Sequence, residues 1–435
     1  MAKDFKIGLI GCGTVGGATA RLLLDDAKNL TSKTGITFTL KYIYTIDPQG
    51  ALKQGAPKEL IVEDYNKLLN DSELDIIVEL VGGTTFAKDY VVSALKAKKH
   101  VVTANKALLA KYGKELFSIA RENGVSIGFE ASCGGGIPVI RAIYDGLMAN
   151  KINALYGIVN GTCNYILTAM IEQGKSYDDV LKEAQAAGLA EADPTLDVNG
   201  MDSAHKLAIL SSLAFAAHCD LEKIPVMGID KLTLKDIQFG QEMGYTIKLL
   251  AMAERSDKGI SLQVRPSFIS KNHPLAWVGG AFNAVSIYAN QVGHTMYYGR
   301  GAGGSPTASA VVSDIISCAL GYNQTRFEAL QIWLDQTETA KQLPQDDIES
   351  RYYLRLDVAD KPGLFASIAN TLSENGISIS GAIQHECKES QVPIIITTHK
   401  TSQGCLKEAL KKLNSSSDIY DSCFLAIVEE PAEFN

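Results

Sequence analysis

A glycine-rich turn between an apolar strand and an amphipathic helix constrains the fold of this chain more than any other stretch. Residues 5–10, FKIGLI, are typical of a buried strand, and GCGTVGG follows directly, before ATARLLLDD with its helical periodicity. In such a strand–turn–helix unit, Gly11 permits the tight turn, Gly13 lets a pyrophosphate approach the backbone, and Gly16 lets the helix approach the strand. The pattern predicts dinucleotide binding, with the phosphates at the helix N-terminus.

A second strand, predicted over residues 38–46, ends at Asp47, whose carboxylate could bind the hydroxyls of an adenosine ribose. Asp47 comes 36 positions after Gly11, whereas the usual spacing is about 20, so we expect an inserted loop around residues 29–35. An acid here favours NAD over NADP. No arginine lies nearby to bind a 2′-phosphate, although Lys53 could, and the choice of cofactor stays open.

Strands and helices alternate through the rest of the first 130 residues. We expect strands at 75–80, 100–104 and 125–129, and helices at 59–70, 87–98 and 107–123. This alternation is typical of an α/β fold with a Rossmann-type, doubly wound parallel sheet. Ligands bind at the carboxyl ends of such strands, so the loops at 81–85, 103–106 and 130–138 should face the cofactor. Lys106 therefore lies at the active edge; the alternative is a solvated lysine at a helix start, where a cation is disfavoured.

The stretch EASCGGGIP, which begins at Glu130, is a second glycine loop. Its backbone carbonyls and the carboxylate at its head could form an oxygen site for a hard cation. A tight hinge that leads the chain out of the sheet explains the same residues equally well.

After residue 140 the pattern changes to an α+β arrangement. Strands are predicted at 152–159, 262–269, 284–290 and 294–299, with helices at 165–172, 176–187 and 202–217. The stretch GLAEADPTLDVNGMDSAHK, residues 188–206, concentrates acids ahead of Lys206. Asp202 and Lys206 stand four positions apart, which places them on one face of a helix. They form either part of a substrate site or a helix start with an ordinary surface ion pair.

Two further segments complete the predicted organisation. GRGAGG, which ends at Gly304, precedes an apolar helix that we expect to return to the first domain and bring Gly303 close to the cofactor. Residues 331–350 are polar and predict a linker. Strand, helix, strand, strand, helix and strand then follow at 351–358, 363–375, 377–385, 392–399, 405–413 and 420–428, which is a ferredoxin-like order.

These patterns predict a nucleotide-binding domain from residues 1–139 and 305–330, an α+β domain with the candidate substrate site at 140–304, a linker at 331–350 and a ferredoxin-like module at 351–435. Composition narrows the class of protein. The net charge of -8 and the absence of a basic run make nucleic acid an unexpected partner. Eight cysteines without a Cys-x-x-Cys pair argue against a disulfide framework or a zinc site. Without a signal sequence or an apolar stretch of membrane-spanning length, we expect a cytoplasmic protein with no membrane partner.

Six segments together resemble the monofunctional homoserine dehydrogenases, and the resemblance covers nearly the whole chain. They are GLIGCGTVGG, VVTANKALLA, EASCGGGIP, NGTCNYIL, GLAEADPTLDVNGMDSAHKLAIL and GRGAGGSPTASAVVSD. The tail, with DKPGL and NGISI, is similar to ACT domains, which sense amino acids. We expect no aspartate kinase segment ahead of the Rossmann domain, unlike in the bifunctional members.

The resemblance implies reversible, NAD(P)-dependent interconversion of L-homoserine and L-aspartate 4-semialdehyde, in threonine, methionine and isoleucine biosynthesis. It also implies a homodimer or homotetramer, because ACT modules usually pair, and an amino-acid effector, for which threonine is our hypothesis. The tail could instead be a packing module without a ligand. Two functions compete with this one: another amino-acid-pathway dehydrogenase, and a sensor that binds nucleotide and amino acid without catalysis. The presence of both Lys106 and Lys206 argues against a sensor.

The resemblance also assigns roles to residues of this chain. Lys206 matches the catalytic lysine, the proton donor, and Lys106 matches a second active-site lysine. Glu191 and Asp202 match the acids that hold homoserine. Cofactor contacts fall on Thr14, Val15, Thr84, Lys106, Gly188 and Gly303, and a sodium site, largely of main-chain oxygens, on Glu130, Cys133, Gly135 and Ile137.

The sequence departs from the family pattern at two places, and the roles of two acids stay open. Cys133 stands where valine is usual, and the second strand lacks the arginine of many NADP-preferring members. Asp193 and Asp197 are as well suited to shape the turn as to touch substrate.

Overall fold

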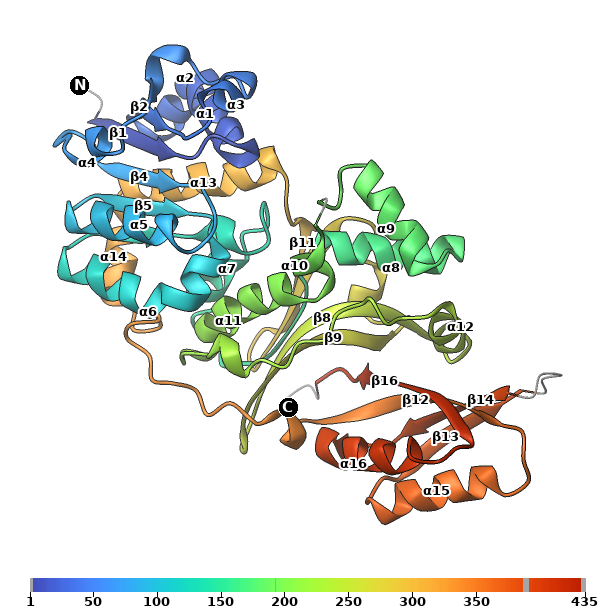
Figure 1. Ribbon diagram of the computed structural model, residues 1–435. Helices are drawn as coiled ribbons and strands as arrows, with labels where there is room; N and C mark the ends of the chain where they lie inside the picture. Colours follow the sequence, from blue (N-terminus) through green and yellow to red (C-terminus); the bar gives the residue numbers. More distant parts are fainter. Residues whose placement is uncertain (1–2, 192, 386–390, 432–435) are drawn as a thin grey trace. The chain divides into compact units, whose positions relative to one another are not determined.

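The computed structural model describes residues 3–191, 193–385 and 391–431. The chain forms two compact units (Figure 1). The first unit consists of Met1–Leu155, His205–Leu221 and Phe282–Ala340, and the second of Tyr156–Ala204, Glu222–Ala281 and Lys341–Asn435. The predicted domain boundaries stay predictions. In the described residues, no helix has both the length and the apolar character needed to cross a membrane.

A six-stranded parallel sheet forms the centre of the first unit, as predicted (Figure 1). Its order is β3-β2-β1-β4-β5-β6. The strands are β1 (Lys3–Ile10), β2 (Ile36–Tyr44), β3 (Ile61–Val62), β4 (Ile76–Glu79), β5 (His100–Thr103) and β6 (Ile127–Gly128). The order runs outward from β1 in both directions, so a topological switch point lies between β1 and β4, where ligands bind in such sheets.

Helices follow the strands of this sheet. Those predicted after β1, β4 and β5 are confirmed as α1 (Thr14–Asp25), α5 (Phe86–Lys96) and α6 (Lys106–Glu122). Shorter helices are α2 (Ala27–Thr34), α3 (Pro48–Lys53) and α4 (Asn66–Leu69). The unit also contains α7 (Val139–Arg141), the antiparallel pair β10 (Phe282–Ala289) and β11 (Gly293–Arg300), α13 (Gly304–Ala319) and α14 (Tyr322–Ala329).

Two local predictions for this sheet were wrong. The inserted stretch around residues 29–35 is a helix, α2, rather than a loop. It buries Leu30 in the core and ends at Gly35, whose φ of 70° suits a helix terminus. The helix predicted at 59–70 is replaced by a 3₁₀ turn (Lys58–Leu60), β3 and α4, because Ile61 and Val62 pair with the end of β2. Tertiary pairing overrides helical propensity there.

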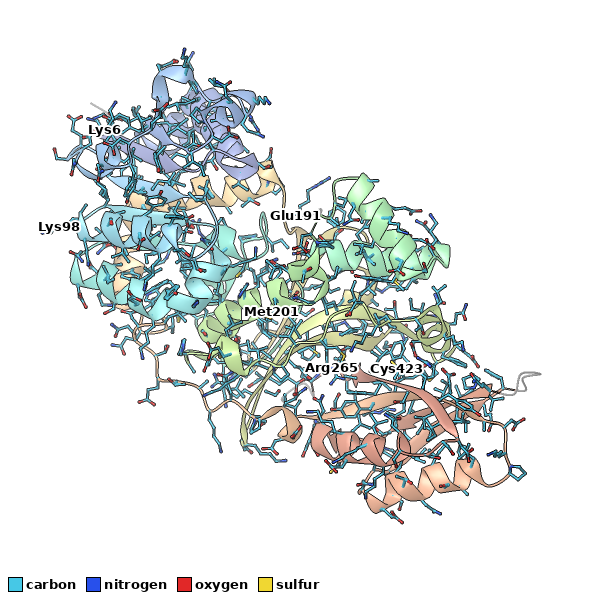
Figure 2. All side chains as sticks on the ribbon, in the orientation of Figure 1. Lys6, Lys98, Glu191, Met201, Arg265 and Cys423 are labelled. Atoms are coloured by element: carbon cyan, nitrogen blue, oxygen red, sulfur yellow. The ribbon has the colours of Figure 1, made fainter. Side chains whose placement is uncertain are left out.

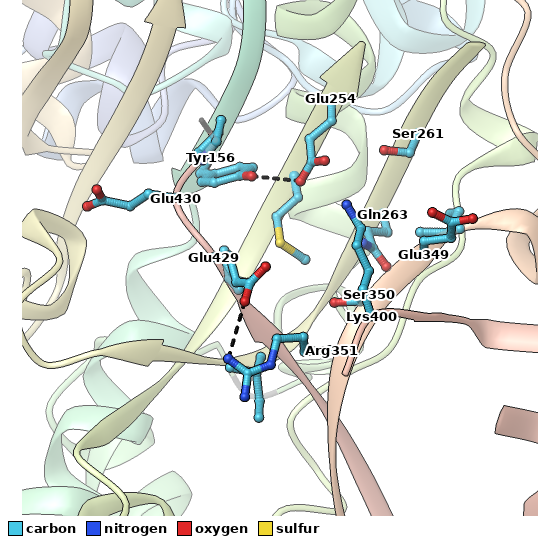
Figure 3. Close-up of a pocket in the computed structure, with 15 residues that line it drawn as sticks. Tyr156, Glu254, Ser261, Gln263, Glu349, Ser350, Arg351, Lys400, Glu429 and Glu430 are labelled. Atoms are coloured by element: carbon cyan, nitrogen blue, oxygen red, sulfur yellow. Dashed lines mark hydrogen bonds and ion pairs between the residues drawn. The ribbon is translucent and has the colours of Figure 1, made fainter. Parts of the chain in front are cut away.

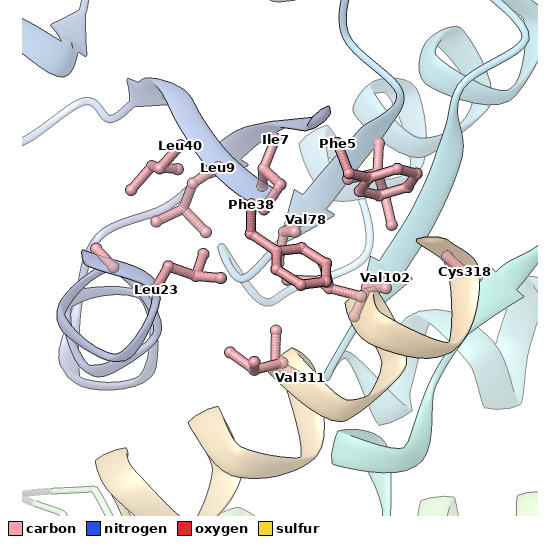
Figure 4. Close-up of a cluster of buried hydrophobic side chains, with 14 of the residues drawn as sticks. Phe5, Ile7, Leu9, Leu23, Phe38, Leu40, Val78, Val102, Val311 and Cys318 are labelled. Atoms are coloured by element: carbon pink, nitrogen blue, oxygen red, sulfur yellow. The ribbon is translucent and has the colours of Figure 1, made fainter. Parts of the chain in front are cut away.

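The hydrophobic core of the first unit joins segments that are far apart in sequence. Ile7, Leu9 and Val78 from the sheet contact Leu23 of α1 and Val311 of α13 in one cluster (Figure 4). Each fully buried aliphatic side chain of this kind stabilises the fold by about 1.5–3 kcal/mol. The prediction that the apolar helix after GRGAGG returns to the nucleotide-binding domain is therefore confirmed.

Mixed strand pairing characterises the second unit. Its sheet contains, in order of neighbours, β8 (Tyr245–Ser256), β9 (Gly259–Ser270), β16 (Ile419–Val428), β12 (Glu349–Ala359), β14 (Gln391–Thr398) and β13 (Ile379–Gln384). β7 (Ile152–Ile158) crosses the division between the units, and the helices α8 (Gly161–Gln173), α9 (Tyr177–Ala186), α10 (Thr195–Val198) and α12 (Leu234–Glu242) follow along the chain. β8 was not predicted: it is buried on both faces, so its sequence lacks the alternation that marks a strand.

The C-terminal strands confirm the ferredoxin-like prediction. β12, α15 (Leu364–Glu374), β13, β14, α16 (Gln403–Leu413) and β16 follow one another, and β16 pairs in parallel with β9. We call residues 349–428 the C-terminal module. Residues 331–348 before it contain only a short 3₁₀ turn as regular structure, yet they are not an exposed linker. Trp333 and Leu334 are buried, and Gln342 forms a bridge to Ile260.

An ion pair removed from water joins the C-terminal module to α12. Asp236 of α12 and Arg355 of β12 are both buried, and Nε of Arg355 lies 2.8 Å from Oδ1 of Asp236. The hydroxyl of Tyr353 donates to the same oxygen at 3.1 Å. Arg355 also pairs with Asp357 and Asp421.

We expect Asp236→Asn to lower the free energy of unfolding by about 3–5 kcal/mol, because it leaves a buried guanidinium without the most deeply buried of its three countercharges. The measurement is thermal and urea unfolding. Glu183→Gln, which breaks the exposed pair with Lys175, is the matched control and should cost less than about 1 kcal/mol. Equal losses in the two variants would contradict a structural role for the buried pair.

Candidate active site

The first glycine loop has one glycine that the protein's own packing does not require. Gly11 has a φ of 87°, and a Cβ there would lie 2.8 Å from the carbonyl of Leu80. A Cβ at Gly16 would overlap the carbonyl oxygen of Gly11. Around Gly13, in contrast, a Cβ would have nothing within 4 Å in the described residues. Gly11 and Gly16 thus serve the turn and the helix approach as predicted, and Gly13 leaves open space where a pyrophosphate would fit.

Two helix N-termini meet at this loop. α1 begins after Gly13 and α13 after Gly303, and within the described chain neither has a side-chain cap. A Cβ at Gly304 would lie 3.0 Å from the carbonyl oxygen of Thr14, so the two helix starts are close together. Uncapped N–H groups and the helix dipole favour an anion here, which fits the phosphates of a dinucleotide.

Asp47 lies just beyond the end of β2 and is exposed. Its Oδ1 accepts a hydrogen bond from the N–H of Gly50 at 2.9 Å and so caps α3. The predicted contact with a ribose stays a prediction, and the carboxylate has a structural role besides it.

Sequence reasoning missed a buried carboxylate at the carboxyl edge of the sheet. Glu79, the last residue of β4, accepts hydrogen bonds from the hydroxyl of Thr103 at 2.7 Å and the N–H of Val81 at 2.8 Å. The hydroxyl of Thr103 in turn accepts from the N–H of Asn105. An acid that ends an apolar strand was the signal that could have revealed it, since a buried carboxylate needs donors.

Asn105 extends this hydrogen-bond network from Thr103 to the start of α6. Its side chain donates to the carbonyl of Gly83 at 2.7 Å and accepts from the N–H of Leu108 at 3.1 Å, which caps the helix. The loop with half-buried Thr84 is therefore tied to the helix that begins at Lys106. Lys106 is half-buried, in agreement with a place at the active edge rather than in open solvent.

Glu130, at the head of the second glycine loop, is buried and uses its side chain to organise the backbone. Its two carboxylate oxygens accept from the N–H groups of Ile140 and Arg141, each at 2.9 Å. Burial, and next the charge of Asp314, raise the pKa of Glu130 to about 8, against the effect of those N–H donors. The hinge interpretation therefore accounts for the carboxylate.

The glycines after Glu130 bring the loop against neighbouring backbone. Gly134 and Gly135 have φ of 75° and 54°, and a Cβ at Gly135 would lie 2.6 Å from the carbonyl of Gly301. The thiol of Cys133 is fully buried and lies 3.9 Å from the carbonyl oxygen of Lys206. The loop that follows β6 and the helix that bears Lys206 are thus in contact in the first unit.

In the second unit, Asn160 connects the NGTCNYIL motif to the acidic stretch. Its amide nitrogen donates to Asp197 at 2.8 Å and to Asp202 at 2.9 Å. Its oxygen accepts from the N–H of Cys163 at 2.8 Å and caps α8. Asn160 is a second residue that sequence reasoning missed, although the asparagine that opens the motif was visible.

The acids ahead of Lys206 separate into different environments. Asp193 accepts from the N–H and the hydroxyl of Thr195, which lowers its pKa and marks it as a turn-shaping residue. Asp197 shares the amide of Asn160 with Asp202. Glu191 and Gly188 are exposed, and Figure 2 labels Glu191 and Met201 along this stretch.

α11 (Met201–Phe215) carries Asp202 and Lys206 and connects the two units, because the division falls between Ala204 and His205. Asp202 and Lys206 are each only 8% exposed. Four positions apart, they share one helix face. The alternative of an ordinary solvated ion pair is therefore wrong.

Three family models match the chain. The model described as "Homoserine dehydrogenase, NAD binding domain" matches residues 11–130, "Homoserine dehydrogenase" matches residues 138–316, and "ACT domain" matches residues 352–417.

Relatives and solved structures agree with these models. A homoserine dehydrogenase of Pseudomonas aeruginosa is 43% identical, over 95% of this chain and 96% of its own. The crystal structure of a homoserine dehydrogenase from Thiobacillus denitrificans is 40% identical, with a TM-score of 0.92 over 98% of this chain and 99% of that one. A hyperthermophilic archaeal homoserine dehydrogenase in complex with NADPH has a TM-score of 0.62 and 27% identity, over 73% of this chain and 98% of that one.

We expect Asn160→Ala to lower the free energy of unfolding by about 1–3 kcal/mol, because two carboxylates lose a donor that is buried with them. Thermal unfolding measures the effect. Asn66→Ala removes an exposed amide that donates to Asp64 at 3.0 Å, and should change stability by no more than about 0.5 kcal/mol. If both variants unfold alike, Asn160 does not hold the acidic stretch.

Proposed function

The chain belongs to the homoserine dehydrogenase family, NAD(P)-dependent oxidoreductases that act on a CH–OH group, and we propose that Lys206 and Lys106 manage the proton of its reaction. The reaction interconverts L-homoserine and L-aspartate 4-semialdehyde. The observation that carries the proposal is the burial of Lys206 on one helix face with Asp202, whose carboxylate Asn160 binds.

Oxidation of the alcohol removes a hydride from its carbon and a proton from its oxygen. The nicotinamide cofactor, when bound, accepts or supplies the hydride. Lys206 takes the proton of the hydroxyl as the aldehyde forms and returns it in the reverse direction. Lys106, at the first position of α6, assists in this proton transfer. The side chain of Asn105 caps α6 and so fixes the backbone from which Lys106 extends.

Two acids of the second unit are proposed to bind homoserine. Asp202 is suited to accept hydrogen bonds from the substrate's ammonium or hydroxyl, because it is a buried carboxylate on the same helix face as Lys206. Exposed Glu191 supplies a second carboxylate for the ammonium. Fixing the substrate in this way lowers the entropic cost of reaching the reactive geometry. Asp197 accepts a hydrogen bond from the same amide nitrogen of Asn160 and so helps to fix the donor that binds Asp202.

The proposed cofactor contacts are Gly11, Gly13, Thr14, Val15, Gly16, Thr84, Lys106, Gly188 and Gly303. Gly13 and Thr14 lie at the start of α1, and Gly303 lies at the start of α13. Both NAD and NADP fit the open space at Gly13 and the uncapped helix N-termini. Asp47 favours NAD, because a carboxylate repels a 2′-phosphate.

A sodium ion is a further proposal, at the main-chain oxygens of Glu130, Cys133, Gly135 and Ile137. Oxygen donors suit a hard cation. The Glu130 carboxylate already accepts two backbone N–H groups, so its carbonyl is the oxygen left for an ion. An ion there would hold the glycine loop against α11.

The ACT match supports amino-acid regulation, for which we propose threonine as feedback inhibitor of an enzyme in threonine, methionine and isoleucine biosynthesis. A homodimer or homotetramer is proposed with it. A sensor without catalysis is the weaker alternative, because the family match covers both the nucleotide-binding and the substrate segments.

Lys206→Ala should lower kcat for homoserine oxidation by about 10²–10⁴-fold, because general acid–base catalysis by one side chain is worth that much. Cofactor affinity, measured by fluorescence titration, should stay nearly unchanged. Lys182→Ala removes an exposed lysine of α9 and serves as the control. Retention of kcat within a few fold of the parent would exclude Lys206 as the acid/base, and absence of homoserine turnover in the parent would favour the sensor.

Asp47→Ser should raise the ratio of kcat/KM with NADP to kcat/KM with NAD by about tenfold or more, because it removes the charge that repels a 2′-phosphate. Serine keeps a capping hydroxyl for α3, so the fold should be preserved. Steady-state rates with each cofactor measure the ratio. An unchanged ratio would mean that Asp47 only caps α3.

A further inference from the structure

We propose that a pocket in the second unit, between the β8–β9 hairpin and strands β12 and β16, binds a free α-amino acid. The pocket encloses about 310 Å³, at the lower end of the range for small-molecule sites (Figure 3). Its use as a regulatory site rests on the function proposed above, whereas binding itself does not.

The charges that line the pocket match a zwitterion. Among the described residues that line it are four glutamates, Glu254, Glu349, Glu429 and Glu430, and two cations, Arg351 and Lys400. Acids and bases that face the same pocket can bind an ammonium and a carboxylate at once. Glu349 already pairs with Lys258 and Glu429 with Arg351, so Glu254 and Lys400 are the charges that we assign to the ligand.

Tyr156 and Glu254 provide an ordered place for an ammonium. The hydroxyl of Tyr156 donates to Oε1 of Glu254 at 2.6 Å, which fixes the carboxylate and leaves its second oxygen as an acceptor. Figure 3 shows Glu254 and Glu430 in the same part of the pocket as Tyr156. Arg351 is less available, because its Nη1 lies 3.2 Å from Glu429 and its Nε donates to the carbonyl of Thr398.

Gln263 of β9 is the observation that points to a ligand independently of charge. Its side chain lines the pocket and is only 7% exposed, and the described residues form no hydrogen bond to its amide. Because Gln263 lines the pocket, a ligand there would supply the hydrogen-bond partner that the described residues do not. The amide N–H₂ is suited to donate to a carboxylate.

Arg265 adds positive charge behind Gln263. Side chains two positions apart on a strand point to the same face, about 7 Å apart along it. Arg265 is 3% exposed, and its guanidinium lies over the rings of Tyr352 and Phe424, at 5.6 and 5.2 Å from their centroids. Its Nε and Nη2 have no hydrogen-bond partner in the described residues. The carboxylate of the amino acid is therefore assigned to the side of Gln263 and Lys400, and its ammonium to Glu254 and Glu430.

The walls of the pocket explain how a ligand there would act. β8 and β9 fall within the segment that matches the homoserine dehydrogenase model, whereas β12 and β16 belong to the C-terminal module. β9 and β16 pair directly through Ser267 and Ala426. An amino acid that contacts all of these strands would brace the C-terminal module against the catalytic segment, and it would do so away from α15 and α16.

Calorimetric titration of the full-length protein tests the proposal, with threonine, methionine and lysine as amino-acid probes and with acetate and propylamine as single-charge probes. At least one amino acid should bind the parent at millimolar concentration, and neither single-charge probe should. Glu254→Gln, Gln263→Met and Lys400→Met should each weaken binding by about tenfold or more. Glu408→Gln, an exposed acid of α16, should bind like the parent.

Folding and activity are followed in the same variants. Lys400 is exposed, so Lys400→Met tests the site even if a buried substitution fails to fold. The proposal is overturned if no amino acid binds the parent, or if Lys400→Met and the folded pocket variants bind as tightly as Glu408→Gln. Homoserine oxidation without added amino acid should be unchanged in every variant. Binding without any such oxidation would refute the proposed function and leave the site supported.

Discussion

A carboxylate can leave water only if hydrogen-bond donors are buried with it, and the arrangement of the candidate site depends on that constraint. Asn160 supplies the donors for Asp202, and Thr103 with two backbone N–H groups supplies them for Glu79. In both places one side-chain donor, Asn160 or Thr103, comes from a different segment than the acid. Burial of each charge therefore ties together loops that are far apart in sequence, and those loops carry Lys106 and the acidic stretch.

The glycines of the candidate site serve two different purposes. Gly11 and Gly16 are required by contacts within the protein, since a side chain at either would collide with backbone. Gly13 and Gly303 have no such collision with backbone, and each stands directly before a helix start without a side-chain cap in the described chain. The open space at Gly13, together with the positive ends of two helices at this loop, is suited to an anion.

The C-terminal module is part of the same sheet as the β8–β9 hairpin. β16 pairs with β9, and the buried pair of Asp236 and Arg355 connects α12 to β12. The module is therefore joined to the β8–β9 hairpin by backbone hydrogen bonds and to α12 by one desolvated ion pair. Residues 331–348 also contribute buried side chains such as Trp333, so their polar composition concealed a packed segment.

By itself, the sequence determined the parallel sheet, the ferredoxin-like order, the glycine turn and the two lysines, because periodicity and turn chemistry are local properties. Tertiary structure decided the rest. β8 is buried on both faces and so carries no alternation, and β3 forms where a helix was predicted because β2 offers it partners. Glu79, Asn160 and Gln263 acquire their significance only from neighbours and burial, since the donors, acceptors and empty space around a polar side chain come from other segments.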